Sequence, residues 1–346
     1  MTDETVSGSS SDVSTATDET VLVTGGAGFI GSHLSEALLD HGREVVVLDS
    51  LDDYYDVRIK EHNIEICRQH ADDQFTYING SITDGDLVEE LFDQFDIDFV
   101  YHEAARAGVR SSVEQPQLYE EINVGGLLTL LECAADNDVT RFINASSSSV
   151  YGRPDYLPYD EQHPTYPKSP YATTKLANEH YCKIWNDVYD LPTVSLRYFT
   201  VYGPRMRPNM AISNFVSRSL NNRSPVVYGD GEQTRDFTYI DDIVTANLQL
   251  LETDAADGEV INIGSTDTIS INELVDHVIA ETGTEVEPEH VAAKDVDARH
   301  THADISKAQR LFGYEPSTEI RDGVSSFIDW YQGNESWYEP LVLASS

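Results

Sequence analysis

The stretch that decides the fold is Val21-Leu-Val-Thr-Gly-Gly-Ala-Gly-Phe-Ile-Gly31, close to the start of the chain. It begins with β-branched residues typical of a strand, turns at a glycine cluster and continues into a helix. Gly25 permits a tight turn, Gly28 lets the backbone approach a pyrophosphate, and Gly31 allows the helix to pack closely on the strand. The helix N-terminus then directs free amides and a partial positive charge at the phosphates. The pattern predicts a dinucleotide site whose contacts from this turn are Gly25, Gly28, Phe29, Ile30 and Gly31.

A carboxylate closes the next predicted strand. Asp49 follows the apolar run at residues 44–48. Its oxygens can accept hydrogen bonds from the ribose hydroxyls and would repel a 2′-phosphate, so the expected cofactor is NAD and not NADP. The alternative interpretation is a structural glycine turn with Asp49 as a capping residue.

Alternating strand and helix patterns predict an α/β fold with a doubly wound parallel sheet, the Rossmann arrangement. After Val201 the chain becomes richer in loops and proline, which predicts a smaller C-terminal substrate lobe. This lobe is interleaved with the first, because strands near 193–199 and 259–263 return to the main sheet. The other predicted strands are 21–24, 44–48, 75–78, 98–102 and 141–145, and helices are predicted near 32–40, 86–95, 125–135, 271–282 and 305–311. The expected divisions are a disordered acidic tail (1–19), an NAD-binding domain (20–200) and the second lobe (201–335).

The charge of the chain is unusual. Sixty-one acidic residues against 22 basic ones give a formal net charge of −39, and the acids are spread along the whole sequence. Such self-repulsion is tolerable in concentrated salt, where the screening length falls to about 3 Å at 1 M. We therefore expect a soluble protein from the cytoplasm of a halophile; an ordinary acidic protein is the alternative. The same charge argues against nucleic acid or an anionic membrane as a partner.

The sequence predicts neither a membrane anchor nor a metal site. It has no apolar run of about 18 residues, and the first twenty residues lack the basic region of a signal peptide. Cys67, Cys133 and Cys182 are widely separated and lack metal-ligand spacing, as expected for reduced thiols in a cytoplasm.

Two motifs carry candidate catalytic groups. Tyr171 and Lys175 are four residues apart in a helical stretch, so their side chains share one face. A tyrosine has a pKa near 10, and a neighbouring ammonium with a positive nicotinamide ring stabilises the phenolate that removes a proton. The serine run 146–149 follows Ala145 at the end of a predicted strand, where ligand-contacting groups of a parallel sheet lie. The alternatives are a chance Tyr-x-x-x-Lys spacing and a serine-rich turn.

Together these motifs resemble the extended short-chain dehydrogenase/reductase family, and within it the nucleotide-sugar 4-epimerases. The likeness extends from about Val21 to Trp330. Besides the glycine turn and Tyr171/Lys175, it rests on Ala145-Ser-Ser-Ser-Ser-Val-Tyr-Gly152, His102-Glu-Ala-Ala-Arg-Ala-Gly-Val-Arg110, Leu196-Arg-Tyr-Phe-Thr-Val-Tyr-Gly-Pro204, Arg235-Asp-Phe-Thr-Tyr-Ile-Asp-Asp242 and Asp297-Ala-Arg-His-Thr301.

The resemblance implies roles for matching positions. Tyr171 is the base, Ser147 shares the substrate proton, and Lys175 lowers the tyrosine pKa and binds the ribose. Residues 201–335 form the nucleotide-sugar-binding lobe. The implied cofactor contacts are Ala104 and Ala105, which would flank the cofactor, and Ser81 and Ile82 at the adenine; many relatives carry Asp where Ser81 stands. The implied substrate contacts are Asn214, Arg235 and Arg299 on the diphosphate and Tyr228 on the uracil. The alternative for each arginine is a structural salt bridge in an acid-rich protein.

The reaction expected from the serine run is epimerisation. In the related 4,6-dehydratases an Asp-Glu pair precedes Val-Tyr-Gly, whereas this chain has Ser148 and Ser149, which cannot perform carboxylate acid–base chemistry. Hydride transfer from C4, rotation of the 4-ketone and return of the hydride need no such group. The alternatives are a reductase or dehydrogenase on the same scaffold, and a non-catalytic regulator that binds NAD or a nucleotide.

Two segments, 49–60 and 199–211, resemble the UDP-glucuronate 4-epimerases. The resemblance implies that Arg207, Thr200 and the serines Ser148 and Ser149 bind the sugar carboxylate. Arg205-Met206 departs from the Trp-Gly usual there, and Arg207 could instead lie in a surface loop. UDP-glucuronate and UDP-glucose therefore both remain candidate substrates, and a UDP-N-acetylhexosamine is a less favoured third. The resemblance also implies a homodimer built on helices 125–135 and 171–189, whose apolar faces could equally be ordinary core.

Overall fold

The structure is a computed structural model, and it describes residues 19–292 and 298–344. The acidic tail expected at 1–19 thus lies almost wholly outside the described residues, as does Asp297. A seven-stranded parallel sheet forms the centre of the molecule, in the order β11-β6-β5-β4-β1-β2-β3. Its strands are β1 (Thr20–Thr24), β2 (Glu44–Asp49), β3 (Phe75–Asn79), β4 (Ile97–His102), β5 (Arg141–Ser147), β6 (Thr193–Tyr198) and β11 (Val260–Ile263). The predicted doubly wound parallel sheet is confirmed.

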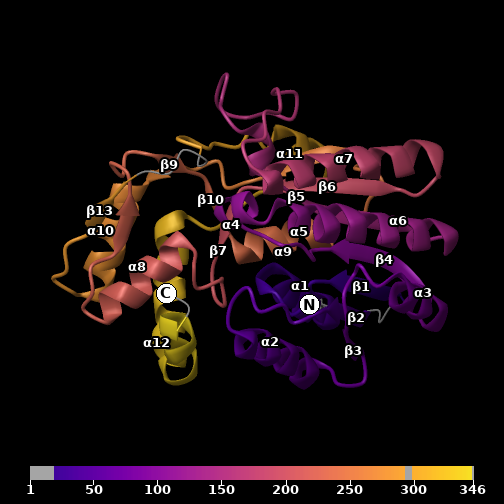
Figure 1. Cartoon of the computed structure of the whole chain (residues 1–346), viewed down its shortest axis with the longest axis horizontal. Helices are drawn as coiled ribbons and strands as arrows, with labels where there is room; N and C mark the ends of the chain where they lie inside the picture. Colours follow the sequence, from indigo (N-terminus) through magenta and orange to yellow (C-terminus); the bar gives the residue numbers. More distant parts are fainter. Residues whose placement is uncertain (1–18, 293–297, 345–346) are drawn as a thin grey trace, which may run out of the picture.

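Helices cover both faces of this sheet (Figure 1). Alternate residues of each strand point to opposite faces, so Val21 and Val23 enter one apolar cluster and Leu22 enters the other. Because both faces are covered, β1 and β2 carry continuous apolar runs at residues 21–23 and 45–48 and do not alternate. One face packs against α1 (Phe29–Asp40), α2 (Val57–His70) and α9 (Ile240–Gln249), and the other against α3 (Gly85–Gln94), α6 (Gly126–Asp136) and α7 (Pro170–Val188).

The strand order reverses beside β1. The chain builds β1, β2 and β3 outward in one direction and then returns to place β4 on the other side of β1. A crevice therefore opens at the carboxyl ends of β1 and β4, where ligands of doubly wound sheets bind. Short helical segments line the approach to this crevice: α4 (Val109–Glu114), α5 (Pro116–Glu120), a π-turn (Glu121–Gly125) and a 3-10 turn (Ser148–Tyr151).

A smaller lobe lies beside the sheet, on the left in Figure 1. It joins short strand pairs to helices whose apolar faces continue the larger core cluster. Its elements are β7 (Thr200–Tyr202), α8 (Ala211–Leu220), β8 (Val226–Tyr228), β9 (Thr234–Arg235), β10 (Phe237–Tyr239), β12 (Ile269–Ser270), α10 (Ile271–Thr282), β13 (Glu289–Val291) and α12 (Ile320–Ala344). The short helix α11 (Ser306–Phe312) instead packs against β11 of the main sheet.

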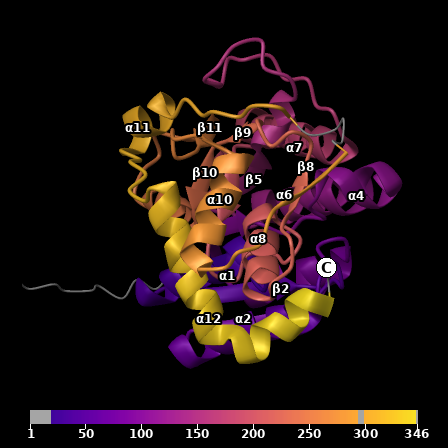
Figure 2. The same ribbon diagram turned by 90° about the vertical axis from the view of Figure 1, so that its left-hand side faces the viewer.

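The last helix ties the two lobes together. Figure 2 shows α12 running along the smaller lobe and down to α2. The Trp337 ring lies against His62 of α2 with ring centroids 3.9 Å apart and the planes tilted by 38°, and the buried Tyr338 hydroxyl donates to the Met206 carbonyl at 2.8 Å. The loop that carries residues 203–210 is thereby fixed from the side of α12. No helix among the described residues is long and apolar enough to cross a membrane.

Candidate active site

A cavity of about 500 Å³ lies at the carboxyl ends of the sheet strands, between the two lobes. Its wall includes the glycine turn, the ends of β2, β4, β5 and β6, the start of α7 and the loop after β7. Of the predicted site residues, those that line it are Gly25, Gly28, Phe29, Ile30, Gly31, Asp49, Ser81, Ile82, Ala104, Ala105, Ser147, Ser148, Ser149, Tyr171, Lys175, Thr200, Arg207 and Arg235.

The glycine turn packs directly on the end of β4. Gly25 has φ +71°, and a Cβ placed on it would lie 2.6 Å from the backbone nitrogen of Ala104. A Cβ on Gly31 would lie 2.4 Å from the Gly25 carbonyl oxygen. Gly28 precedes α1 without a side-chain cap, so the first amides of this helix are left for another acceptor. The turn therefore has the shape and the dipole that a pyrophosphate requires.

Asp49 is held by the backbone around it. Its carboxylate accepts hydrogen bonds from the amides of Ala27 at 3.1 Å and Leu51 at 2.8 Å. Burial raises the pKa of Asp49, and the nearby ammonium of Lys60 opposes that rise. Lys60 also lines the cavity, which the sequence did not predict, and donates to the Asp52 carbonyl at 2.8 Å. This end of the cavity thus combines a fixed carboxylate with a nearby cation.

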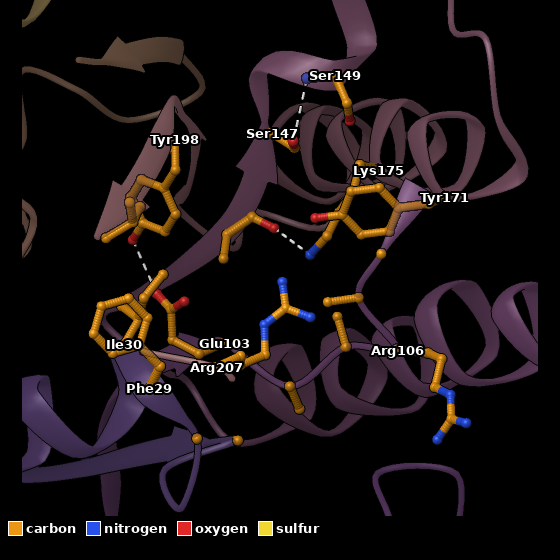
Figure 3. Close-up of a pocket in the computed structure, with 18 of the residues that line it drawn as sticks. Phe29, Ile30, Glu103, Arg106, Ser147, Ser149, Tyr171, Lys175, Tyr198 and Arg207 are labelled. Atoms are coloured by element: carbon orange, nitrogen blue, oxygen red, sulfur yellow. Dashed lines mark hydrogen bonds between the residues drawn. The ribbon is translucent and has the colours of Figure 1, made fainter. Parts of the chain in front are cut away.

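The predicted catalytic side chains meet at the other end of the cavity, which we call the catalytic end (Figure 3). Ser147 ends β5, and its hydroxyl accepts from the Ser149 amide at 3.2 Å. Tyr171 and Lys175 lie one turn apart on α7, a helix that begins at Pro170 with the Ser169 hydroxyl as its cap. The end of β5, the 3-10 turn that follows it and the capped start of α7 together determine the positions of these three side chains.

The charges at this end determine how readily the side chains ionise. Burial lowers the pKa of Lys175 to about 8, and its ammonium donates to the Ala145 carbonyl at 2.5 Å. Burial raises the pKa of Tyr171, whereas the positive charge of Arg207 and a hydrogen bond with Ser147 lower it. The sequence assigned the lowering of the tyrosine pKa to Lys175; in the structure Arg207 has the largest opposing effect.

Arg207 lies inside the cavity and not on the surface. Its guanidinium lies 5.5 Å from the ring centroid of Tyr54 and points toward the catalytic end (Figure 3). Among the described residues no carboxylate forms an ion pair with it. It is therefore a half-buried cation that faces the space open to a ligand.

Three predicted substrate contacts do not line the cavity. Arg299 is exposed and pairs with Asp230 at 3.0 Å, which is the salt-bridge arrangement that the sequence left as its alternative. The Tyr228 ring is covered by the guanidinium of Arg110, 4.3 Å from its centroid. Asn214 is half-buried on α8. Arg235, the remaining contact predicted for the nucleotide end, does line the cavity. Its Nη1 donates to the Thr234 and Arg299 carbonyls.

The structure adds a second group that the sequence did not identify, besides Lys60. Glu103 lines the cavity directly after β4, and the Tyr198 hydroxyl donates to its Oε1 at 2.9 Å. A carboxylate that immediately follows an apolar strand was the available signal, because that edge of a parallel sheet faces the ligand. Among the described residues no cluster of His, Cys, Asp and Glu could hold a metal ion.

Comparisons with known proteins agree with this geometry. Residues 22–327 match the family described as GDP-mannose 4,6 dehydratase. A putative UDP-glucose 4-epimerase of Methanocaldococcus jannaschii is 37% identical over 318 residues, which are 91% of this chain and 99% of that protein. The chain belongs to the extended short-chain dehydrogenase/reductase family. The family predicted from the motifs is therefore confirmed.

Other members of this dehydrogenase/reductase family are equally similar. A UDP-glucuronate 4-epimerase of Thermodesulfobacterium geofontis is 37% identical over 314 residues, covering 90% of this chain and 96% of that protein. The crystal structure of the Bacillus cereus UDP-glucuronic acid 4-epimerase, in complex with UDP-glucuronic acid and NAD, superposes with a TM-score of 0.86 at 38% identity. That likeness covers 91% of this chain and 99% of the Bacillus chain.

Proposed function

We propose that this protein is an NAD-dependent 4-epimerase of UDP-sugars that works through a 4-keto intermediate. The observation that carries the proposal is the meeting of Ser147, Tyr171 and Lys175 in the cavity that the glycine turn closes. The relatives named as 4-epimerases support the same reaction.

The residues of the cavity fit NAD. Gly28 lines the cavity at the start of α1 and has no side chain to keep a pyrophosphate from the first helix amides, and Asp49 on the same cavity wall would accept hydrogen bonds from a ribose diol. When bound, NAD supplies a hydride acceptor and donor for C4. The chain's own groups handle the proton: Tyr171 takes it from the C4 hydroxyl, Ser147 shares it through its hydrogen bond with Tyr171, and the positive charge of Arg207 stabilises the phenolate.

The two residues after Ser147 favour epimerisation over dehydration. Ser148 and Ser149 both line the cavity, so the two positions that would need carboxylates for proton transfer at C5 and C6 carry hydroxyls. A reductase on the same scaffold would release NADH with each turnover, whereas an epimerase shows no net change in cofactor. Net turnover therefore distinguishes these two reactions.

Among the sugars, we propose UDP-glucuronate. Its supporting observation is Arg207, a cation in the cavity wall beside Thr200 and the serine run. A guanidinium binds a carboxylate in a bidentate fashion, whereas a hydroxymethyl group has no matching charge. UDP-glucose is the second candidate, since the Methanocaldococcus relative is named for that sugar.

At the nucleotide end, we propose that Arg235 binds the diphosphate, because it lines the cavity. Arg299 could join it only by leaving Asp230, and Tyr228 could reach uracil only by giving up its contact with Arg110. Asn214 on α8 stays a proposed contact of the same diphosphate. Arg235→Ala should therefore weaken inhibition by UDP more than Arg299→Ala does.

The test of the main proposal is direct. The purified protein is incubated in molar KCl with UDP-glucuronate and, separately, with UDP-glucose, and the anomeric protons are followed by NMR. Conversion of UDP-glucuronate to UDP-galacturonate is the expected result. Conversion of UDP-glucose alone would keep the epimerase and move the substrate to the second candidate. Conversion of neither sugar, with NAD bound, would contradict the proposal.

We also propose that the protein is a homodimer that works in a high-salt cytoplasm. Exposed apolar side chains at the end of one helix support the dimer: Ile184 and Val188 lie one turn apart on α7, and Tyr189 follows them. The net charge of −39 supports the salt requirement. Analytical ultracentrifugation across a KCl series tests both, and Val188→Glu should yield monomers if this face forms the dimer.

A further inference from the structure

Glu103 is a carboxyl group in the cavity that the proposed proton transfer does not use. It follows β4 directly, one residue before Ala104, whose backbone packs against Gly25. Figure 3 shows it on the same open space as Tyr171, Lys175 and Arg207. Glu103 is thus a half-buried carboxyl group that lies between the glycine turn and the catalytic end.

Buried hydrogen bonds fix the position of this group. The Tyr198 hydroxyl donates to Glu103 Oε1 at 2.9 Å, and Asn247 Nδ2 donates to the Tyr198 oxygen at 2.9 Å. The Tyr101 hydroxyl in turn donates to the Asn247 carbonyl at 2.8 Å. Tyr198, Asn247 and Tyr101 are all buried. Because a tyrosine proton is aimed at Glu103, the arrangement suits an accepting carboxylate and holds it still.

The electrostatic surroundings couple Glu103 to the catalytic end. Burial raises the pKa of Glu103 to about 7, while the hydrogen bond from Tyr198 and the charge of Lys175 lower it. Conversely, the charge of Glu103 raises the pKa of Lys175 and of Tyr171. A fixed negative charge in this position stabilises a neighbouring cation.

We propose that Glu103 is a positioning residue that holds a negative charge at the catalytic end and thereby favours oxidised over reduced NAD. This inference rests on the function proposed above. The oxidised nicotinamide ring is positively charged and the reduced ring is neutral, so the carboxylate stabilises the former more. An epimerase must return the hydride to its sugar in every turnover, and a cofactor poised toward its oxidised form aids that return.

The test uses the full-length protein with its NAD bound. Glu103→Gln keeps the size of the side chain and an acceptor for Tyr198 but removes the charge. At a pH above 8, where Glu103 with its pKa of about 7 carries its charge, and at one fixed applied potential set with a redox dye, the bound NADH:NAD⁺ ratio is read from NADH absorbance. The ratio should be about tenfold higher in the variant, the effect of a charge that shifts a pKa by about one unit. Glu103→Asp keeps the charge and should keep the wild-type ratio.

Glu161→Gln is the matched control. Glu161 is also half-buried with a pKa raised by burial, but it accepts from the Asn262 amide at 2.8 Å and does not line the cavity. Its variant should keep the wild-type ratio. Glu103→Leu, which needs no hydrogen-bond partner, replaces the glutamine variant if that fails to fold.

An unchanged ratio in the Glu103 variants that lack the charge, or an equal rise in Glu161→Gln, overturns the inference. Sugar conversion by the wild-type protein, measured on the same samples, tests the proposed function separately. A shifted ratio without conversion of either sugar would leave the role of Glu103 standing and contradict the epimerase proposal.

Discussion

Nη1 of Arg205 donates a hydrogen bond to Oε1 of Glu36 at 2.6 Å, which joins the loop after β7 to α1 across 169 positions of the sequence. The same guanidinium reaches Nδ1 of His33 at 2.8 Å. Burial, followed by the charge of Arg205, holds the pKa of His33 well below its usual range, so the imidazole is neutral and accepts this bond. Arg207 follows two residues later, so this pair anchors the loop that carries it.

Replacing Arg205 should destabilise the protein and loosen Arg207. Arg205 is buried, so Arg205→Ala leaves Glu36 without its partner and should cost about 3 kcal/mol of unfolding free energy. The KM for UDP-glucuronate should rise more than kcat falls. Urea unfolding in high salt and steady-state kinetics measure both effects. The exposed pair of Arg58 and Asp56 is the control, and Arg58→Ala should leave stability and KM unchanged. Equal behaviour of the two variants would contradict a positioning role.

Removing the Tyr171 hydroxyl should abolish most turnover without weakening substrate binding. Tyr171→Phe removes the proton acceptor, and general base catalysis contributes about 100- to 10,000-fold. The expected kcat falls within that range, while affinity for UDP-sugar, measured by calorimetry, stays near the wild-type value. Tyr181→Phe changes a tyrosine on the same helix that packs against Trp185 and should behave as wild type. Undiminished turnover by Tyr171→Phe would refute the mechanism.

Arg207 should separate the two candidate sugars. If it binds the sugar carboxylate, Arg207→Ala should raise the KM for UDP-glucuronate about 30-fold or more, as expected for removing one partner of a buried charge pair worth about 2 kcal/mol or more. Any activity on UDP-glucose should be unaffected in KM. Because Arg207 lowers the Tyr171 pKa, the acid limb of kcat should also move to higher pH. Arg153→Ala, at an exposed position, serves as the control.

The stability of the protein should depend on pH through Glu103. Its folded-state pKa of about 7 lies above the value of 4.5 expected for an unfolded chain. Its contribution to stability is therefore full below about pH 4.5 and is lost as the pH rises through 7. Lys175 has the opposite sign: its pKa is depressed to about 8, so its contribution is lost as the pH falls through 8. In urea titrations, the free energy of unfolding of Glu103→Gln relative to wild type should rise by at most about 3 kcal/mol between pH 4.5 and pH 8. A constant difference across that range would contradict the pKa assignment.

Local sequence patterns were enough to predict the sheet and much of the cavity wall. The turn at Gly25 follows β1, Asp49 ends β2, and Tyr171 and Lys175 share a helix face because of their spacing. In each case, the neighbours that determine the position of the group lie within a few residues. Such groups can be placed from periodicity and strand ends alone.

Groups whose partners are distant in sequence were missed or placed less well. Tyr198 and Glu103 are 95 residues apart, and nothing near Glu103 indicates that a tyrosine faces it. Tyr228 was expected to face a ligand, yet the Arg110 guanidinium covers its ring, and Arg299 pairs with Asp230. The helix at Val57–His70 was also missed, because charged and polar side chains dominate that segment and its buried face is narrow. Packing between distant segments determines all of these.

The late position of β11 in the sequence also affects how the sheet folds while the chain is being synthesised. β6 is buried along its whole length, and within the described residues its outer edge pairs with Val260–Ile263. During synthesis the first two hundred residues would therefore emerge with an apolar strand edge exposed until the ribosome has added more than sixty further residues, and exposed edges of this kind promote aggregation. A fragment that ends near residue 200 retains that edge permanently. The NAD-binding half is therefore structurally complete only when residues 260–263 have joined its sheet.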